Sequence, residues 1–215
     1  MNKSKFDRNY FEGKTSAYKG GYARADALIL SRLELVQKYV KSGRLLDVGC
    51  AYGFFLQEAK RYFACYGFDV SNYAISRAKG YDRKIKFKVA SAEKDWPYEN
   101  DFFDAITMWD VLEHLENPEN SIKEARRCLA NEGYFFVQTP NKFIRNLIGD
   151  KDKTHINKKN VGSWIKLFKV NGFKIVECYT EFPNFIGNRD WINKILKIFR
   201  LPLGTNISFV LKKLK

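Results

Sequence analysis

Two glycines and two aspartates in the first half of the chain have the types and spacing needed to bind a nucleotide-like ligand. Asp47 lies in a short apolar run that leads into Gly49 and Gly53. Glycines at such a strand-to-helix turn let a ligand approach the backbone, and the helix that follows offers unpaired N–H groups. Asp69 lies 20 residues after Gly49, where its carboxylate can accept hydrogen bonds from both hydroxyls of a ribose. A purely structural turn and a solvated aspartate would give the same pattern.

Short apolar runs alternate with helical patterns along the chain, and this alternation predicts parallel βαβ units in a doubly wound sheet. We expect strands at residues 44–48, 64–70, 85–90, 103–109, 133–138, 173–179 and 207–212, and helices at 23–40, 54–63, 73–80, 118–129 and 160–171. The expected strands place Gly49, Asp69 and the segment after residue 109 at one edge of the sheet.

Length and composition favour a single cytoplasmic domain. The chain has 215 residues, of which 45% are hydrophobic, which is enough for one core and short for two. Its first residues are too charged for a signal peptide, and no uninterrupted apolar run is long enough to span a membrane. The cysteines are too scattered for a zinc site or a disulfide framework, so we expect reduced thiols and no structural metal. They are Cys50, Cys65, Cys128 and Cys178.

Four separated segments occur in a fixed order: Asp47–Gly53 (DVGCAYG), Gly67–Ser71 (GFDVS), Ala90–Glu93 (ASAE) and Trp109–Leu115 (WDVLEHL). Together they resemble the motifs of class I S-adenosylmethionine-dependent methyltransferases, most closely the small-molecule branch typified by ubiquinone and menaquinone methyltransferases. The resemblance runs from about Arg44 to the C-terminus. It implies an α/β, Rossmann-like, doubly wound seven-stranded sheet, mostly parallel with a reversed C-terminal β-hairpin, and helices on both faces.

The resemblance also assigns roles to individual residues. Asp47 and the glycines would shape the pocket for the methionine part of S-adenosyl-L-methionine, Asp69 would hold the ribose, residues 91–93 would frame the adenine, and Trp109 would border the cofactor. Many relatives have glycine where Ala51 stands and aspartate where Ser91 stands, and the second difference weakens the expected contact to the adenine amino group. The cofactor-binding residues implied are Asp47, Gly49, Cys50, Gly53, Asp69, Val70, Ser91, Ala92, Glu93 and Trp109.

An NAD-dependent dehydrogenase is the competing interpretation of the glycine turn. Ala51 stands where the dinucleotide fingerprint has its second glycine, and the segment with Glu113 and His114 fits the methyltransferase pattern better. We therefore favour methyl transfer, with S-adenosyl-L-homocysteine as the product.

His114 and His155 are the chain's two histidines, and we expect both in loops at the edge of the sheet where an acceptor would bind. Either could act as a general base, because histidine titrates near neutrality. The structural alternatives are that His114 orients its loop and that His155 caps a helix near Asn160. A further hypothesis, drawn from quinone-type relatives, places a divalent cation on Glu113, His114 and Asp110, although we expect no metal.

We divide the domain into an N-terminal arm and helix (1–43), a cofactor-binding core (44–140) and a substrate-side, sheet-closing part (141–215). Residues 142–215 hold 16 Lys/Arg against 5 Asp/Glu, a net charge of +11 out of +14. Such a surface could attract RNA, anionic lipid or a phosphorylated substrate, or simply be solvated.

We expect a small-molecule acceptor, lipophilic or anionic, with an RNA methyltransferase and a non-catalytic cofactor-binding module as alternatives. Residues 190–201 have an apolar stripe with basic neighbours, which suits a membrane surface, a roof over the acceptor, or an ordinary helix packed on the sheet. Aromatic residues of the arm could cover the pocket, and they are Tyr10, Phe11, Tyr18 and Tyr22. The sequence leaves the oligomeric state and the acceptor atom open.

Overall fold

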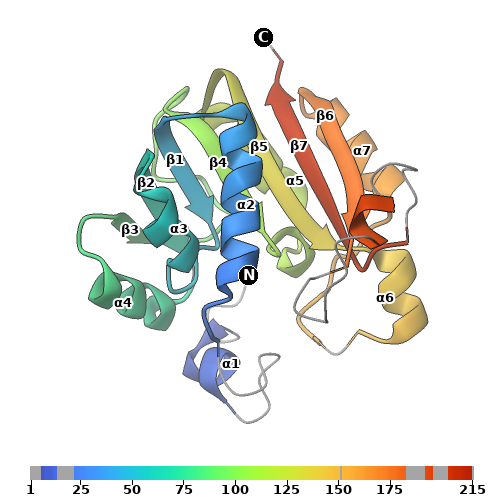
Figure 1. Cartoon of the computed structure of the whole chain (residues 1–215), viewed down its shortest axis with the longest axis horizontal. Helices are drawn as coiled ribbons and strands as arrows, with labels where there is room; N and C mark the ends of the chain where they lie inside the picture. The colour runs from blue at the N-terminus through green and yellow to red at the C-terminus, as the bar shows by residue number, and fades with distance from the viewer. Residues whose placement is uncertain (1–5, 14–21, 151, 183–191, 196–202, 215) are drawn as a thin grey trace.

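A seven-stranded sheet forms the centre of the molecule in the computed structural model, which describes residues 6–13, 22–150, 152–182, 192–195 and 203–214 (Figure 1). The strand order is β3-β2-β1-β4-β5-β7-β6, and β7 runs antiparallel to both of its neighbours, β5 and β6. The predicted Rossmann-like sheet with a reversed C-terminal hairpin is therefore confirmed. The strands are β1 (Gly43–Val48), β2 (Phe63–Asp69), β3 (Lys86–Val89), β4 (Phe103–Trp109), β5 (Leu129–Pro140), β6 (Phe173–Glu181) and β7 (Asn206–Lys213).

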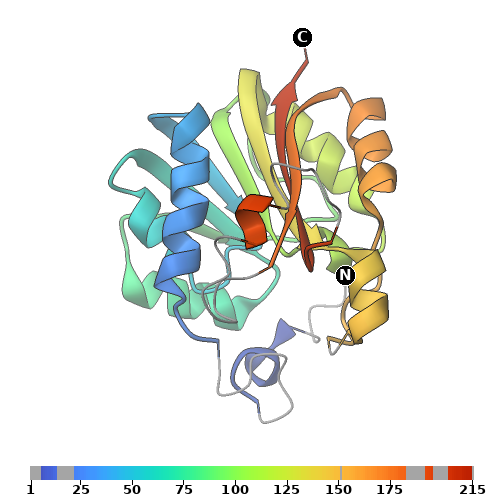
Figure 2. The ribbon, with the colours of Figure 1, turned by 45° about the vertical axis from the view of Figure 1, so that its right-hand side comes forward.

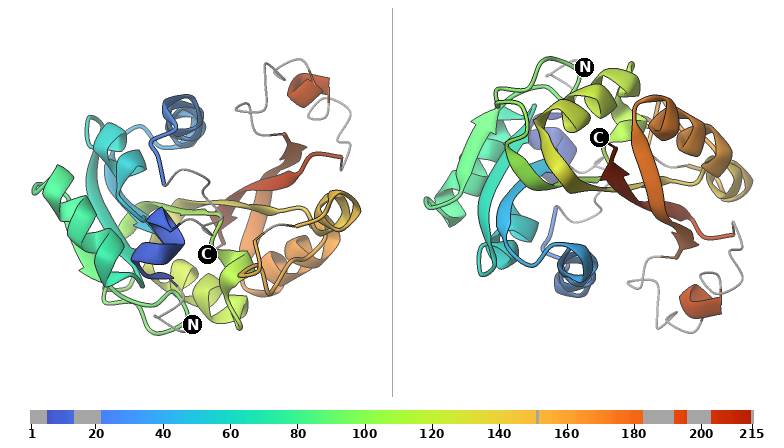
Figure 3. Two further views of the ribbon diagram at one scale, coloured as in Figure 1. Left: turned by 90° about the horizontal axis from the view of Figure 1, so that it is seen from below. Right: turned by 90° about the horizontal axis from the view of Figure 1, so that it is seen from above.

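Helices cover both faces of the sheet, as the views along its edges show (Figure 3). One face packs against α2, α3 and α4 in a core around Leu33, Phe55 and Phe136. The other packs against α5 and α7 in a core around Ile122 and Trp164. The helices are α1 (Arg8–Glu12), α2 (Asp26–Tyr39), α3 (Phe54–Ala59), α4 (Asn72–Tyr81), the short 3₁₀ turn η2 (Leu112–His114), α5 (Pro118–Cys128), α6 (Lys142–Ile148) and α7 (Val161–Val170).

Most predicted elements begin or end within a few residues of their observed bounds, and β5 differs most. It starts at Leu129, four residues before its predicted start, because Leu129 pairs with Phe103 across an irregular stretch of the ladder. Glu132 has a positive φ of 65° in that stretch, which is typical of a bulge. A bulged residue breaks the apolar alternation, so the pattern alone placed the strand too late.

The carboxyl ends of the parallel strands lie along the lower edge of the sheet in Figure 1, and α1 and α6 lie beside that edge (Figures 1 and 2). The aromatic arm predicted for the N-terminus is partly described as α1, whose Phe11 is buried, while Tyr18 lies outside the described residues. Of the predicted excursion at 190–201, residues 192–195 are helical and the others lie outside the described residues. Among the described helices, none is long and apolar enough to cross a bilayer.

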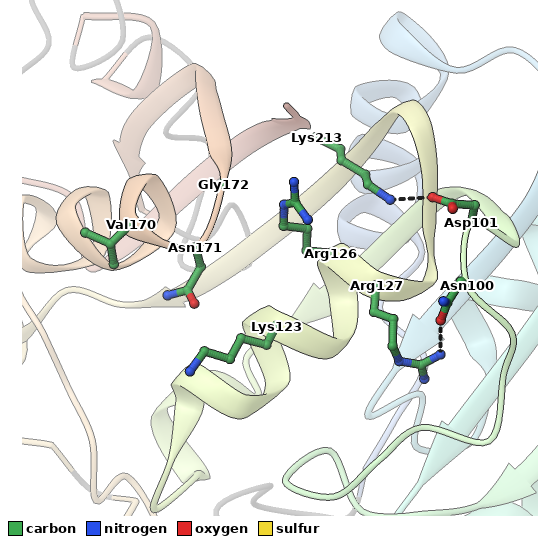
Figure 4. A pocket seen from close by; sticks show the side chains of 9 residues that line it. All are labelled: Asn100, Asp101, Lys123, Arg126, Arg127, Val170, Asn171, Gly172 and Lys213. Carbon is green, nitrogen blue, oxygen red and sulfur yellow. Dashed lines mark hydrogen bonds and ion pairs between the residues drawn. The ribbon is translucent and has the colours of Figure 1, made fainter. Parts of the chain in front are cut away.

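A basic hollow of about 630 Å³ lies at the opposite edge of the sheet, where α5 and α7 end (Figure 4). Its cations already have partners: Lys213 is bonded to Asp101, Arg127 to Glu124, and Lys123 to Glu119. Arg126 stacks against Gly172, where a Cβ atom would lie 2.4 Å from Nε. Three of the four cations are thus paired with carboxylates, while Arg126 donates to Leu214 O at 3.2 Å. The residues singled out by the sequence lie at the other edge.

Candidate functional site

The turn between β1 and α3 requires glycine at two positions. Gly49 and Gly53 have φ values of +73° and +72°, in the left-handed region that favours glycine. A Cβ atom at Gly49 would lie 2.4 Å from Val111 Cγ2, and one at Gly53 would lie 2.6 Å from Phe87 Cζ. Ala51, between them, also has a positive φ of 46°. Both positions therefore require glycine, because of the backbone conformation and because core side chains pack directly against them.

Asp69, at the end of β2, joins that strand to the glycine turn. Its two carboxylate oxygens accept hydrogen bonds from Ala51 N at 3.0 Å and from Ser71 N at 2.9 Å. Burial raises the pKa of Asp69, and the bonds from Ser71 and Ala51 oppose that rise. The carboxylate thus lies beside the turn as predicted, and it has a structural role there in addition to the predicted contact with a ribose.

Asp47 is buried near the end of β1 and accepts a hydrogen bond from Thr107 Oγ1 at 2.7 Å. Burial raises the pKa of its carboxyl to about 7, although the Thr107 bond and the Arg32 charge oppose the rise. Asp47 is therefore a buried acid whose charge changes near neutral pH.

Cys50 and Val70 are both buried beside the turn. The Cys50 side chain packs in the core, where a Cβ atom on Gly67 would lie 2.9 Å from its sulfur. Burial raises the pKa of the Cys50 thiol well above its ordinary value. The thiol is therefore not a reactive thiolate, and the Cys50 backbone is bonded within the turn, its N–H to Phe68 O at 3.1 Å and its carbonyl to Gly53 N at 2.8 Å. All four cysteines are unpaired.

The loop after β3 is bonded to the start of α5. Glu93 Oε1 accepts hydrogen bonds from Glu116 N at 2.6 Å and Asn117 N at 3.1 Å. Ala92 O accepts one from Ser121 Oγ at 2.6 Å, and Ser91 Oγ accepts one from Glu93 N at 3.3 Å. The predicted adenine segment is thus held in place, with the Glu93 carboxylate used to fix it.

Trp109 closes β4, and Arg32 of α2 lies over its ring with the guanidinium carbon 4.9 Å from the ring centroid. Arg32 also donates to Asp110 Oδ2 at 2.6 Å and to Gln138 Oε1 at 2.5 Å. Trp109 Nε1 and Arg32 Nε are both buried without a hydrogen-bond partner. Arg32 was not predicted as a site residue, although it lies at helical spacing between the buried Ile29 and Val36, where a charged residue is unusual.

The two histidines, 41 positions apart in sequence, lie together at this edge with ring centroids 4.9 Å apart. His114 Nδ1 lies 3.2 Å from Thr154 O and 2.9 Å from Thr154 Oγ1. His155 Nδ1 lies 2.9 Å from Asp150 Oδ2. Because a carbonyl and a carboxylate can only accept, both rings donate through Nδ1, which leaves both Nε2 atoms as the basic ones. The cap of α7 is Asn160, not His155.

Glu113 completes this cluster from within η2. Its side chain is fully buried, Oε2 accepts from Thr139 Oγ1 at 3.1 Å, and Oε1 has no hydrogen-bond partner. Oε1 lies 3.9 Å from His155 Nε2. Burial raises the pKa of Glu113 well above its ordinary value, helped by the Asp110 charge. Burial also lowers the pKa of His114, which therefore favours the neutral imidazole.

Two of the residues hypothesised to hold a divalent cation, Glu113 and His114, lie together here, and His155 takes the place suggested for Asp110. Donor atoms of Glu113, His114 and His155 all lie within 4.8 Å of one another, and two imidazoles with one carboxylate suit a transition metal. Asp110, the third residue of the hypothesis, is instead paired with Arg32. The expectation that the protein needs no metal stays a prediction.

The N-terminal segment that contains the short helix α1 contacts both the glycine turn and the histidine pair. Phe11 stacks on Tyr52 of the glycine turn, with ring centroids 5.2 Å apart, and Tyr52 Oη donates to Glu12 Oε1 at 3.1 Å. Phe6 meets the His114 ring edge-on at 5.6 Å. The arm therefore bridges the glycine turn and the histidine pair.

Known proteins resemble this chain in both sequence and fold. A sequence-family model described as a methyltransferase domain matches residues 22–178. A protein of Methanocaldococcus jannaschii is 27% identical over 180 residues, which cover 79% of this chain and 83% of that protein. A ubiquinone biosynthesis O-methyltransferase of Pelagibacter ubique is 33% identical over 118 residues, 52% of this chain and 48% of that enzyme. The chain thus spans about half of the length of that named relative.

The fold has close counterparts among solved structures. An S-adenosylmethionine-dependent methyltransferase from Mesorhizobium loti superimposes with a TM-score of 0.68 at 18% identity, covering 87% of this chain and 99% of that one. The chain belongs to the methyltransferase domain family and is a class I S-adenosylmethionine-dependent methyltransferase. Its cofactor is S-adenosyl-L-methionine, which removes the dehydrogenase interpretation.

Proposed function

We propose that the protein transfers a methyl group from S-adenosyl-L-methionine to a small-molecule acceptor that binds beside His114 and His155. One observation carries this proposal: two imidazoles, each hydrogen-bonded through Nδ1, lie at the strand edge that also holds the glycine turn and Asp69. Methyl transfer needs an aligned nucleophile and often the removal of its proton. A base beside the cofactor pocket would remove that proton.

The residues at the edge fit the cofactor. The turn between β1 and α3 has the left-handed backbone at Gly49 and Gly53 that only glycine adopts easily, and Asp69 lies next to it. Arg32 and Trp109 each keep a buried N–H without a partner, which a polar group of the cofactor could satisfy, while the Arg32 charge is paired with Asp110. When bound, the cofactor supplies an electrophilic methyl group on a sulfonium. The residues proposed to hold the cofactor are Asp47, Gly49, Cys50, Gly53, Asp69, Val70, Ser91, Ala92, Glu93, Trp109 and Arg32.

His155 is the stronger candidate for the general base. Its Nδ1–H donates to Asp150 at 2.9 Å, and a carboxylate in that position fixes the tautomer and stabilises the imidazolium formed when Nε2 accepts a proton. His114 lies beside it, and the lowered pKa of His114 keeps that ring neutral at physiological pH. A hydroxyl or amine of the acceptor would lose its proton to His155 Nε2. In the proposed division of the chain, residues 141–215 supply this acceptor side.

The test uses calorimetry followed by an acceptor screen. S-adenosylhomocysteine should bind saturably, NAD should not, and Asp69→Ala should weaken binding. A panel of phenols, amines and carboxylates with labelled S-adenosyl-L-methionine would then identify the acceptor class, with His155→Gln as the catalytic control. If His155→Gln transferred methyl groups as fast as the parent while binding the cofactor normally, the assignment of the base would be wrong.

A further inference from the structure

Helix α6 (Lys142–Ile148) carries three large apolar side chains exposed to solvent. Phe143, Leu147 and Ile148 are 64%, 75% and 59% exposed, and we call them the α6 surface. Phe143 and Leu147, four positions apart, lie on one side of the helix. Ile148 extends this exposed surface at the end of the helix, next to the buried Ile144. The largest exposed apolar patch of a monomeric protein is often a functional one that contacts another surface.

The exposed charged side chains in the sequence around the α6 surface are mainly positive. Lys142 and Lys153 are exposed. The two acidic side chains of the following loop, Asp150 and Asp152, are only 7% and 14% exposed and face His155. Asp150 is also paired with Lys158. The outward side of this region therefore combines apolar groups with lysines, and its carboxylates point inward.

We propose that the α6 surface docks on the surface of an anionic lipid bilayer. A helix with apolar side chains on one side and lysines at its margin inserts at the boundary between headgroups and acyl chains, and the lysines contact anionic headgroups. A second copy of the chain fits less well. In a two-fold dimer the same patch faces itself, which would bring Lys142 and Lys153 of both copies together without opposing charges.

The docking surface and the histidine pair belong to one stretch of chain. The loop that follows α6 carries Thr154, which is bonded to His114, and His155 itself. Docking would thus hold the acceptor side next to the bilayer. The proposal does not depend on which residue acts as the base, since it can be tested without any acceptor.

The experiment is sedimentation of the full chain with vesicles of phosphatidylcholine that contain phosphatidylglycerol, compared with phosphatidylcholine alone, at low and moderate salt. We expect binding to the anionic vesicles and little to the neutral ones. Leu147→Ser and Phe143→Ser should each lower the partition coefficient, by about tenfold when combined. Val170→Ser is the matched control, because Val170 is 68% exposed at the opposite edge of the sheet. Lys142→Glu with Lys153→Glu should weaken binding to the anionic vesicles alone.

Three results would overturn the proposal. The first is that the parent protein does not sediment with anionic vesicles at low salt, and the second is that Leu147→Ser behaves like Val170→Ser. The third is that light scattering shows a dimer which Leu147→Ser dissociates while vesicle binding stays unchanged, since the α6 surface would then be an interface between copies. Circular dichroism verifies that each variant is folded, and calorimetry with S-adenosylhomocysteine tests the cofactor site separately.

Discussion

Asp47→Asn should remove a pH dependence of stability that the buried carboxyl creates. The pKa of Asp47 rises from 3.8 to about 7 in the folded protein because its side chain is buried. A raised folded pKa means that stability is fully present below the unfolded pKa of about 3.9 and is lost as the pH rises through about 7. The rise in pKa corresponds to about 4 kcal/mol of stability at low pH, and about 3 kcal/mol of that stability is lost between about pH 5 and pH 8. Asparagine has the same shape and no charge to desolvate.

The assay is urea unfolding without cofactor at about pH 5 and pH 8, for the parent, Asp47→Asn and the exposed control Asp95→Asn. Other titrating groups affect all three proteins alike, so the informative quantity is the difference from the parent at each pH. From about pH 5 to pH 8, the free energy of unfolding of Asp47→Asn should rise by about 3 kcal/mol relative to that of the parent. The same difference for Asp95→Asn should not depend on pH. Parallel pH profiles for the parent and Asp47→Asn would refute the reasoning, because the Asp47 carboxyl would then not be desolvated.

Four further predictions concern the glycine turn with Asp69 and the cluster of Glu113 with the two histidines. Ala51→Gly should raise the free energy of unfolding by about 0.5–1 kcal/mol, because alanine is strained at a φ of 46°; a loss of thermal stability would argue against that strain. Asp69→Ala should weaken S-adenosylhomocysteine binding at least about tenfold and destabilise the fold by about 1–3 kcal/mol, because it leaves the N–H groups of Ala51 and Ser71 without acceptors; calorimetry and urea unfolding measure both. His155→Gln should lower kcat by about 100-fold at an unchanged cofactor Kd, and Asp150→Asn by less. Chelator treatment should leave activity intact, whereas a loss restored by one added metal would show that Glu113 and the histidines hold a cation.

The sheet and the glycine turn could be predicted from the sequence because their signals are local. Gly49 and Gly53 follow a short buried strand, and only glycine tolerates the contacts that a Cβ atom would make there. The same locality placed Asp69 correctly, since a residue at the end of β2 must lie beside the end of β1 in a parallel pair. The fold and the position of the expected cofactor contacts follow from these two features.

The parts that escaped prediction depend on how segments pack and turn. Arg32 enters the site because α2 packs near Trp109, which lies far along the chain. Asp150 is close to His155 in sequence, but their contact depends on how the loop after α6 turns. Asp110 adjoins the histidine segment in sequence, yet it has a positive φ of 55° and turns toward Arg32. A pattern along the chain does not encode such directions, which are set by packing.

The place of β7 in the sheet has a consequence for the order in which the molecule can assemble. β6 is synthesised before β7, but in the described sheet its ladder partner is β7, which inserts between β6 and β5. A strand pair whose second strand comes much later in the sequence must close a long loop, and such pairs form slowly. On the ribosome, the glycine turn and its neighbouring parallel strands can therefore form early, while β6 remains an unpaired, aggregation-prone edge until β7 emerges.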